Sequence, residues 1–248
     1  MTVQADEGYY FGMGAFETVA LEQGQPVLFE QHMNRLERTM QFLGIPFRRD
    51  RAERETEHYL KERNTEFTGH DALKIAVSEK NLTMSVRRNP YADRYGDAGF
   101  GIMYSEVIRN ETSPLTYHKT LNYAENLMER RKAQERGFDE AVFLNGRGEI
   151  AEGTVSNVFF VKGNKLYTPP VSCGMLPGVM REYVCRTFKA AETVIRPEDV
   201  GAFDEMFLTN SLMGIMPVQN LGDHWFSSEA AAKQLQKTCC PGHFSTLP

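Results

Sequence analysis

The fold of this chain is decided by two short stretches, His118–Leu127 (HKTLNYAENL) and Ala151–Asn157 (AEGTVSN). The first opens on a basic pair and continues into residues that favour a helix, which places Lys119 at a helix N-terminus. A cation is disfavoured at the positive end of a helix dipole, so the pKa of Lys119 should be lowered and its amine should act as a nucleophile. The second stretch carries a carboxylate, two hydroxyls and an amide between expected strands. Together they predict a small polar site on a rigid scaffold.

The residues around these stretches predict alternating helices and strands in the second half. We expect a helix over Leu121–Arg136 and another that Leu176–Arg181 leads into and that reaches about Ala190, with a proline near its first turn. The side chains of the first helix expected to face inward are Leu121, Ala124, Leu127 and Met128. The expected strands are Ala141–Leu144, Val158–Val161, Lys165–Tyr167 and Glu205–Thr209, with one more beginning at Ile150.

The first half is expected to be α+β. Apolar residues at helical spacing predict an amphipathic helix over Gln31–Leu43, and Asp50–Asn64 should be a second, highly charged helix. A strand is expected at Val19–Leu21, after a Gly-x-Gly turn. Three further β-rich runs, expected to form an antiparallel set, are Ala72–Ser78, Leu82–Val86 and Phe100–Val107.

A polar segment without periodicity, Ile108–Leu115, is the expected linker between two domains. With 248 residues, the chain is long enough for each half to bury its own core. We therefore expect an α/β chain with a small α+β domain over residues 1–113 and a larger domain over residues 114–248.

Composition and charge exclude several function classes. The formal net charge of −5 argues against a nucleic-acid partner, because phosphate binding needs concentrated Lys and Arg. No run approaches the ~18 apolar residues of a membrane helix, and the N-terminus lacks a signal pattern, so a cytoplasmic location is expected. The cysteines form no Cys-x-x-Cys pair and the histidines lack ligand spacing, so we expect reduced thiols and no metal site.

The candidate site residues gain weight from their order along the chain. An isolated lysine is usually a solvated surface group, and Arg35 alone would be a snorkelling arginine. Here Lys119 is followed by Glu152 and then by candidate phosphate ligands. Those ligands are the N–H groups at Gly178–Met180, the hydroxyls of Thr154, Ser156 or Ser211, and Arg35. A lysine, a carboxylate and a phosphate cradle suggest pyridoxal phosphate, with the lysine forming a Schiff base and the acid keeping the ring nitrogen protonated.

The chain resembles the fold-type IV pyridoxal-phosphate enzymes, the family of branched-chain aminotransferase, D-amino-acid aminotransferase and 4-amino-4-deoxychorismate lyase. The segments that carry this resemblance are Phe11–Glu17, His32–Leu36, Lys119–Tyr123, Glu149–Asn157 and Leu176–Arg181. It implies two α/β domains with the cofactor between them, bound mostly by the second, and a homodimer.

The resemblance also implies a role for each matching residue. Lys119 is the Schiff-base lysine, Glu152 the partner of the pyridine nitrogen, and Tyr123 matches a tyrosine near the ring hydroxyl. The phosphate-cradle positions are Arg35, Val179, Met180 and Ser211. With their neighbours in the ordered set, the expected cofactor-binding residues are Arg35, Lys119, Tyr123, Glu152, Ser156, Asn157, Gly178, Val179, Met180, Asn210 and Ser211.

Within the family, two features favour the lyase, which eliminates pyruvate from aminodeoxychorismate to give 4-aminobenzoate for folate biosynthesis. Met180 stands where aminotransferases typically carry threonine, and Asn210–Val218 is similar to the lyase segment. Tyr123, shared with branched-chain aminotransferases, leaves an aminotransferase of D-amino acids or branched-chain L-amino acids as the alternative. Arg87, Arg88 or Arg94 could bind a substrate carboxylate bidentately, with Arg87 and Arg94 the expected ligands, and the alternative for each is a solvated loop residue. Intact Lys119 and Glu152 argue against a third reading, a noncatalytic binding protein.

Overall fold

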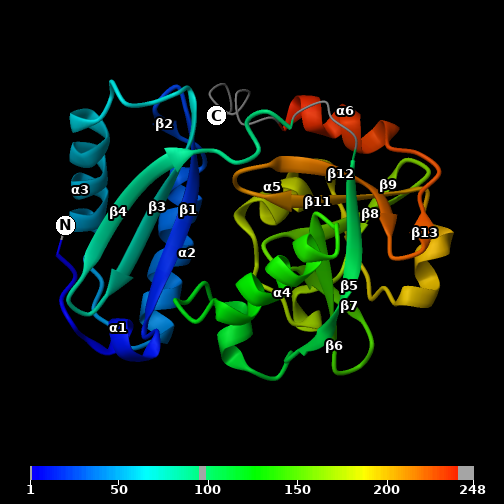
Figure 1. The fold of residues 1–248 in the computed structure, drawn as a ribbon, viewed down its shortest axis with the longest axis horizontal. Helices are drawn as coiled ribbons and strands as arrows, with labels where there is room; N and C mark the ends of the chain where they lie inside the picture. The colour runs from blue at the N-terminus through cyan, green and yellow to red at the C-terminus, as the bar shows by residue number, and fades with distance from the viewer. Residues whose placement is uncertain (1, 95–98, 240–248) are drawn as a thin grey trace. The chain divides into compact units, whose positions relative to one another are not determined.

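The computed structural model describes residues 2–94 and 99–239, which fall into two compact units (Figure 1). Unit 1 contains the described residues 2–94 and 118–123, and unit 2 contains 99–117 and 124–239. Both mix helices with strands, which confirms the predicted α/β class. The expected boundary between residues 113 and 114 falls inside unit 2. The short segment His118–Tyr123, which contains Lys119, belongs to unit 1.

Unit 1 is an antiparallel sheet with two long helices packed on one of its faces. Its described strands lie in the order β2-β1-β3-β4. The elements are α1 (Glu7–Phe11), β1 (Gly14–Glu22), β2 (Gln25–Pro26), α2 (Phe29–Phe42), α3 (Arg49–Glu62), β3 (His70–Ser78) and β4 (Leu82–Arg88). Because side chains alternate across a strand, the register of Val19 with Leu73 and of Leu73 with Val86 places all three on the helix-covered face.

The core of unit 1 follows from the amphipathic pattern of its helices. Met33, Leu36 and Met40 of α2 lie on one face of that helix and are buried in a cluster with Leu73 and Ile75 of β3. The predicted helix Gln31–Leu43 is thus confirmed, with both ends displaced slightly toward the N-terminus. Gly44 follows it with φ +68°, the left-handed conformation that ends helices and favours glycine.

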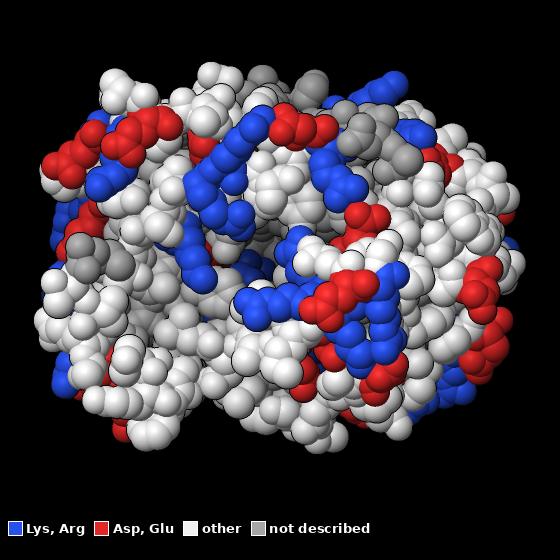
Figure 2. All heavy atoms as spheres, in the orientation of Figure 1, with Lys and Arg blue, Asp and Glu red and all other residues white. Residues whose placement is uncertain are grey.

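The second predicted helix, α3, is also confirmed, and its outer face is charged. Only Ala52, Thr56 and Leu60 of this helix are buried. Arg49 at its start forms ion pairs with Glu30, Glu37 and Glu53. Figure 2 shows basic and acidic side chains intermixed over the face that it draws. Such mixed, exposed pairs make small individual contributions to stability.

Unit 2 is built around a larger, curled mixed sheet (Figure 1). Between residues 99 and 239 its strands lie in the order β10-β9-β8-β11-β12-β5-β6-β7, and β13 pairs with β12. The elements are β5 (Phe100–Arg109), η1 (Pro114–Tyr117), α4 (Ala124–Glu135), β6 (Glu140–Asn145), β7 (Ile150–Gly153), β8 (Asn157–Lys162), β9 (Lys165–Thr168), η2 (Val171–Cys173), α5 (Val179–Phe188), β10 (Ala191–Glu192), η3 (Pro197–Ala202), β11 (Glu205–Asn210), β12 (Gly214–Leu221), β13 (His224–Trp225) and α6 (Ala230–Thr238).

One predicted strand belongs to a different sheet from the one expected. Phe100–Val107 was expected to pair antiparallel with the strands of the first half, but β5 runs parallel to β6 and β12 in unit 2. Its Ile102 and Met103 are buried, and its last residues, Ile108 and Arg109, lie in the segment predicted as a linker. The physical reason is that β propensity marks a strand without naming its partner.

The inward face predicted for the helix after Lys119 is wrong. Leu127 and Met128 of α4 are 44% and 65% exposed, whereas Asn126, Glu129 and Ala133 are buried. The buried polar side chains have partners: Asn126 Nδ2 donates to the Thr154 carbonyl at 2.7 Å, and Glu129 Oε2 accepts from Ser105 Oγ at 2.7 Å. This helix therefore packs through satisfied hydrogen bonds rather than through an apolar stripe.

Candidate active site

Lys119 lies in an extended segment beside β1, not at a helix start. Phe16 N–H donates to the Lys119 carbonyl at 3.0 Å, and Leu121 N–H donates to the Gly14 carbonyl at 2.9 Å. Thr120 forms an antiparallel bridge with Ala15. Since α4 begins only at Ala124, the prediction that Lys119 stands at a helix N-terminus is wrong.

Two aromatic rings border the amine of Lys119. The bridge places Lys119 opposite Phe16, so both side chains leave the sheet on the face that α2 and α3 do not cover. Lys119 Nζ lies 4.3 Å from the centroid of the Phe16 ring and 4.9 Å from that of Tyr123. The two rings meet edge to face at 5.1 Å. Cation–π attraction to both rings positions the amine, and Lys119 stays partly exposed.

Arg35 is buried in an ion pair rather than exposed on a helix surface. Its Nε and Nη2 donate to Glu17 Oε1 and Oε2, each at 2.7 Å, and His32 Nδ1 lies 2.7 Å from the same Oε2. Burial alone would raise the pKa of Glu17, but the charge and hydrogen bonds of Arg35 outweigh it and hold that pKa well below its usual value. Burial, assisted by the positive charges of Arg35 and Lys119, lowers the pKa of His32. His32 is therefore neutral near pH 7, and Arg35 is the charged partner of Glu17.

Glu152, on β7, is a buried carboxylate with two defined contacts. Its Oε2 accepts from the Leu176 N–H at 3.0 Å, and its Oε1 lies 3.4 Å from Arg109 Nη2. Arg109 also donates from Nη1 to Glu125 Oε1 at 3.0 Å, and its guanidinium carbon lies 3.9 Å from the centroid of the Phe143 ring. The side chain of Glu152 is thus held between a backbone N–H and a guanidinium. Sequence reasoning missed Arg109 because its segment was taken for a linker.

The loop after Glu152 is held by a second carboxylate that the sequence did not single out. Glu140 at the start of β6 accepts from the hydroxyl of Thr154, from the Val155 N–H at 3.3 Å and from Ser156 Oγ at 3.2 Å. The hydroxyl of Ser156 is thus used within the protein. Thr154 is fully buried and makes a further backbone bond to Glu140 at 3.1 Å, so this loop is rigid.

The first turn of α5 offers unsatisfied backbone N–H groups. Gly178 is the N-cap residue, and no side chain among the residues that the structure describes caps this helix. Asn157 Nδ2 donates to the Leu176 carbonyl at 3.0 Å, and a Cβ at Gly178 would lie 2.0 Å from Asn157 Oδ1. Only glycine therefore allows this close approach of the helix start to β8. Because the first N–H groups of a helix have no intrahelical partner, Val179 and Met180 lie where an anion would bind.

The turn between β11 and β12 lies beside the same loop. Asn210 Oδ1 accepts from the N–H groups of Leu212 and Met213, each at 2.9 Å, and its Nδ2 donates to the Val155 carbonyl at 3.2 Å. Asn210 thus holds the turn that presents the partly exposed Ser211. Thr209, paired with Asn157 in the sheet, has a buried hydroxyl without a partner within the described chain. An uncapped helix start beside an unpaired buried hydroxyl fits a phosphate group.

The structure links most of the predicted residues of unit 2, and the predicted substrate arginines belong to unit 1. Hydrogen bonds or close approach connect Glu152, Ser156, Asn157, Gly178 and Asn210. Arg87 lies in unit 1 on β4, exposed, opposite Ala72 and therefore on the same sheet face as Lys119. Arg87 lies three strands away from Lys119, and its register with Ala72 and Ala20 places it four residues farther along the sheet than Phe16, which is opposite Lys119. Arg94 is exposed in the turn that follows β4.

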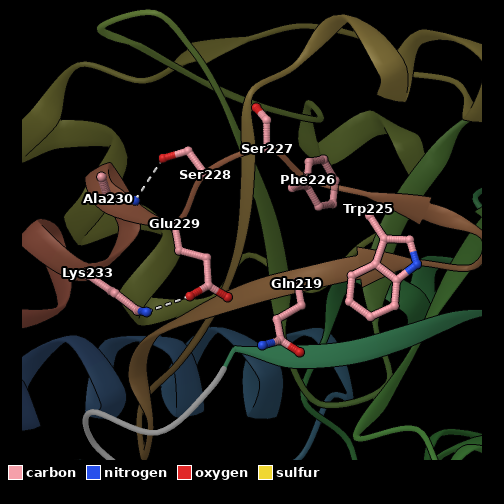
Figure 3. Close-up of a pocket in the computed structure, with 8 residues that line it drawn as sticks. All are labelled: Gln219, Trp225, Phe226, Ser227, Ser228, Glu229, Ala230 and Lys233. Carbon is pink, nitrogen blue, oxygen red and sulfur yellow. Dashed lines mark hydrogen bonds and ion pairs between the residues drawn. The ribbon is translucent and has the colours of Figure 1, made fainter.

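A separate cavity of about 510 Å³ lies beside β12, β13 and the start of α6 (Figure 3). Glu229 and Lys233 point toward each other there, 2.6 Å apart, and Ser228 Oγ accepts from the Ala230 N–H. Trp225 on its rim is 68% exposed. None of the predicted site residues lines this cavity.

In the described part of the chain, no group of His, Cys, Asp or Glu side chains is placed to hold a metal. Every helix there is too short or too polar to span a membrane.

Comparison with known proteins gives consistent matches over nearly the whole chain. The profile of the family described as amino-transferase class IV matches residues 14–221. An aminodeoxychorismate lyase of Bacillus subtilis (strain 168) is 25% identical, covering 91% of this chain and 83% of the relative. A D-alanine aminotransferase of Bacillus licheniformis is 28% identical, covering 91% and 84%. The solved structure of 4-amino-4-deoxychorismate lyase from Pseudomonas aeruginosa superposes with a TM-score of 0.82 at 23% identity, covering 96% of this chain and 95% of that one.

Proposed function

This chain belongs to the amino-transferase class IV family, whose members use pyridoxal phosphate, and we propose that within it the chain is a 4-amino-4-deoxychorismate lyase. In this reaction the substrate loses its enolpyruvyl group as pyruvate and becomes 4-aminobenzoate, a precursor in folate biosynthesis. The product is aromatic, which supplies much of the driving force.

The observation that carries the choice of lyase is the first turn of α5 together with the β11–β12 turn. Position 180 holds a buried methionine, so this turn offers backbone N–H groups without the hydroxyl typical of aminotransferases. The segment Asn210–Val218, similar to that of the lyase, forms the adjacent turn and strand. The B. subtilis relative named aminodeoxychorismate lyase supports the same choice.

An aminotransferase of D-amino acids or branched-chain L-amino acids is the second candidate. The observation that favours it is Tyr123, whose ring lies beside Lys119 Nζ and which branched-chain aminotransferases share. The D-alanine aminotransferase relative points the same way. Both candidates require the same lysine and the same carboxylate, so those two residues do not distinguish them.

The residues present fit pyridoxal phosphate. We assign the phosphate to Arg35, the N–H groups of Val179 and Met180, and Ser211, and we add the unpaired hydroxyl of Thr209. Lys119 is assigned to the aldehyde carbon, Tyr123 to the ring hydroxyl and Glu152 to the ring nitrogen. Ser156, Asn157, Gly178 and Asn210 support these groups through the bonds described above. When bound, the cofactor supplies an electron sink for the carbanion formed at the substrate.

Lys119 and Glu152 carry the proton chemistry. We assign to Lys119 Nζ the removal of the proton from the substrate carbon that bears the amino group, the two rings holding the amine in place. Glu152, paired with Arg109 and fixed by the Leu176 N–H, would hold a proton on the ring nitrogen of the bound cofactor. The C–O bond to the enolpyruvyl group then breaks, the ring becomes aromatic, and the released enolpyruvate takes up a proton to become pyruvate. Arg87 or Arg94 is retained as the proposed ligand of a substrate carboxylate.

The proposed reaction is tested by product analysis. Purified protein loaded with pyridoxal phosphate is given aminodeoxychorismate, and pyruvate and 4-aminobenzoate are measured by a coupled dehydrogenase assay and by chromatography. We expect both products in equal amounts. Parallel incubations supply D-alanine, L-glutamate or L-leucine with 2-oxo acids. Amino transfer in these, with neither lyase product, would reject the proposal in favour of the second candidate.

We further propose that the enzyme acts in the cytoplasm as a homodimer, without nucleic-acid or membrane partners. Tyr9, Tyr10 and Phe11 of α1 are each more than 60% exposed, an apolar surface of the kind that a second copy covers. Light scattering should give twice the chain mass of 28.2 kDa. A single-chain mass at micromolar concentration would contradict the dimer.

Gly178→Ala should weaken cofactor binding by steric displacement alone. Gly178 has φ −71°, which alanine accepts, but the new Cβ would lie 2.0 Å from Asn157 Oδ1 and push the first turn of α5 away. Because hydrogen bonds to a charged group are lost, we expect the dissociation constant for pyridoxal phosphate to rise at least about tenfold. The matched control is Gly201→Ala, whose Cβ would meet only His224 at 3.9 Å and should change the constant less than about twofold. If the two variants had equal dissociation constants for pyridoxal phosphate, the first turn of α5 would not be part of the cofactor site.

A further inference from the structure

The cluster of Glu17, Arg35 and His32 contains a buried carboxylate that the proposed reaction does not use. Glu17 is fully buried, and both of its oxygens accept from the guanidinium of Arg35 in a two-point arrangement. Such a pairing fixes both the position and the plane of a guanidinium, because two parallel bonds leave it no rotation. The orientation of Arg35 is therefore set by Glu17.

Glu17 is itself held firmly, and close to the lysine. It lies in the middle of β1, where it pairs with Ile75 of β3 on one side. On the other side, the Phe16 N–H is bonded to the Lys119 carbonyl. Glu17 is thus one residue away from the backbone bond that places Lys119. The Glu17 side chain faces α2, whereas Lys119 leaves the sheet on the other face, so Glu17 relates Arg35 to Lys119 through the backbone of β1.

His32 completes the cluster without adding a charge. Its Nδ1 lies 2.7 Å from Glu17 Oε2, and burial lowers its pKa, so the neutral ring donates this bond near pH 7. The negative charge of Glu17 is therefore opposed by the positive charge of Arg35 and not by a charge on His32. The bond from the His32 ring keeps the carboxylate from rotating. One turn along α2, Thr39 Oγ1 donates to the Arg35 carbonyl at 3.0 Å.

We infer that Glu17 is a positioning residue, which orients the guanidinium of Arg35 toward the phosphate of the cofactor and fixes its spacing from Lys119. This inference rests on the proposed use of pyridoxal phosphate. A purely structural role for Glu17 makes a different prediction, because loss of fold stability would weaken binding of every form of the cofactor alike. The quantity that distinguishes the two roles of Glu17 is the phosphate preference, defined as the dissociation constant of pyridoxal divided by that of pyridoxal phosphate.

Glu17→Gln keeps the shape of the side chain and removes its charge. We expect it to lower the phosphate preference by about tenfold or more, because Arg35 loses its two charged acceptors, and to change the binding of pyridoxal itself less than threefold. Glu22→Gln is the matched control: Glu22 lies on the same strand, is 7% exposed and pairs with His70 Nδ1 at 2.7 Å, without an arginine. It should leave the phosphate preference unchanged. Equilibrium dialysis gives the constants, and circular dichroism verifies the fold.

A second variant keeps the test decisive if Glu17→Gln does not fold. Glu17→Asp retains the charge but withdraws it by one methylene, and should lower the phosphate preference while Lys119 still forms a borohydride-trapped linkage. In an Arg35→Gln background, adding Glu17→Gln should change the preference less than twofold, since the arginine through which Glu17 acts is gone. An unchanged preference in both single variants, or an equal loss for both ligands, overturns the inference alone. A wild-type protein that does not bind pyridoxal phosphate overturns the proposed function as well.

Discussion

Lys119→Ala should abolish the covalent attachment of pyridoxal phosphate and lower turnover by at least about 10³-fold, within the range that positioned proton-transfer groups contribute. The physical reason is that Lys119 Nζ, bordered by Phe16 and Tyr123, is both the proposed attachment point and the proposed proton acceptor. Borohydride reduction followed by peptide mass analysis measures the attachment directly.

Lys74→Ala is the matched control for this prediction. Lys74 Nζ also lies near the Phe16 ring, 4.8 Å from its centroid, but Lys74 is exposed on β3 and pairs in register with Thr18. It should keep the linkage and nearly all activity. Retention of the trapped linkage in Lys119→Ala would show that another lysine carries the cofactor.

Glu152→Gln should have the second largest effect, a fall in kcat of about 10²-fold or more. The amide cannot hold a proton on the ring nitrogen as a carboxylate does, and it leaves Arg109 beside a neutral group. The measurement is kcat together with the dissociation constant of pyridoxal phosphate, which separates loss of chemistry from loss of binding.

Glu125→Gln controls for the effect on Arg109. Glu125 accepts from Arg109 Nη1 at 3.0 Å, but its side chain is 52% exposed and water can replace it. We expect kcat within about threefold of wild type. If Glu152→Gln kept more than half of the wild-type kcat, its proposed pairing with the ring nitrogen would be wrong.

The sequence predicted elements whose pattern is local. The helix Gln31–Leu43 and the strands Val158–Val161 and Lys165–Tyr167 were confirmed because side-chain periodicity and β propensity specify them within a few positions. The failures involve distant partners. The strand Phe100–Val107 was recognised, but its place in the larger sheet depends on residues more than thirty positions away. The apolar Leu127 and Met128 suggested the wrong buried face, since satisfied polar groups occupy it.

The residues of the candidate site show the same contrast between local features, which could be predicted, and distant partners, which could not. Resemblance pointed to Lys119, Glu152 and the start of α5, and the geometry around each is compatible with the proposed role. The supporting groups were missed because nothing in the local sequence marks them. Glu17, Arg109 and Glu140 are each buried charges within or at the end of a strand, and their partners lie 14 to 43 positions away. Arg109 stands between the exposed Ile108 and Asn110, and Glu140 follows Asp139, so neither lies within an apolar run.

The central claim, that this chain is a lyase, is tested most directly by following the substrate nitrogen. Aminodeoxychorismate labelled with ¹⁵N at its amino group is incubated with the wild-type enzyme, pyridoxal phosphate and 2-oxoglutarate, and the products are examined by mass spectrometry. The lyase reaction retains the nitrogen on the ring, so all of the label should be in 4-aminobenzoate, with one pyruvate released for each. Label in glutamate, with no 4-aminobenzoate, would contradict the account and identify an aminotransferase.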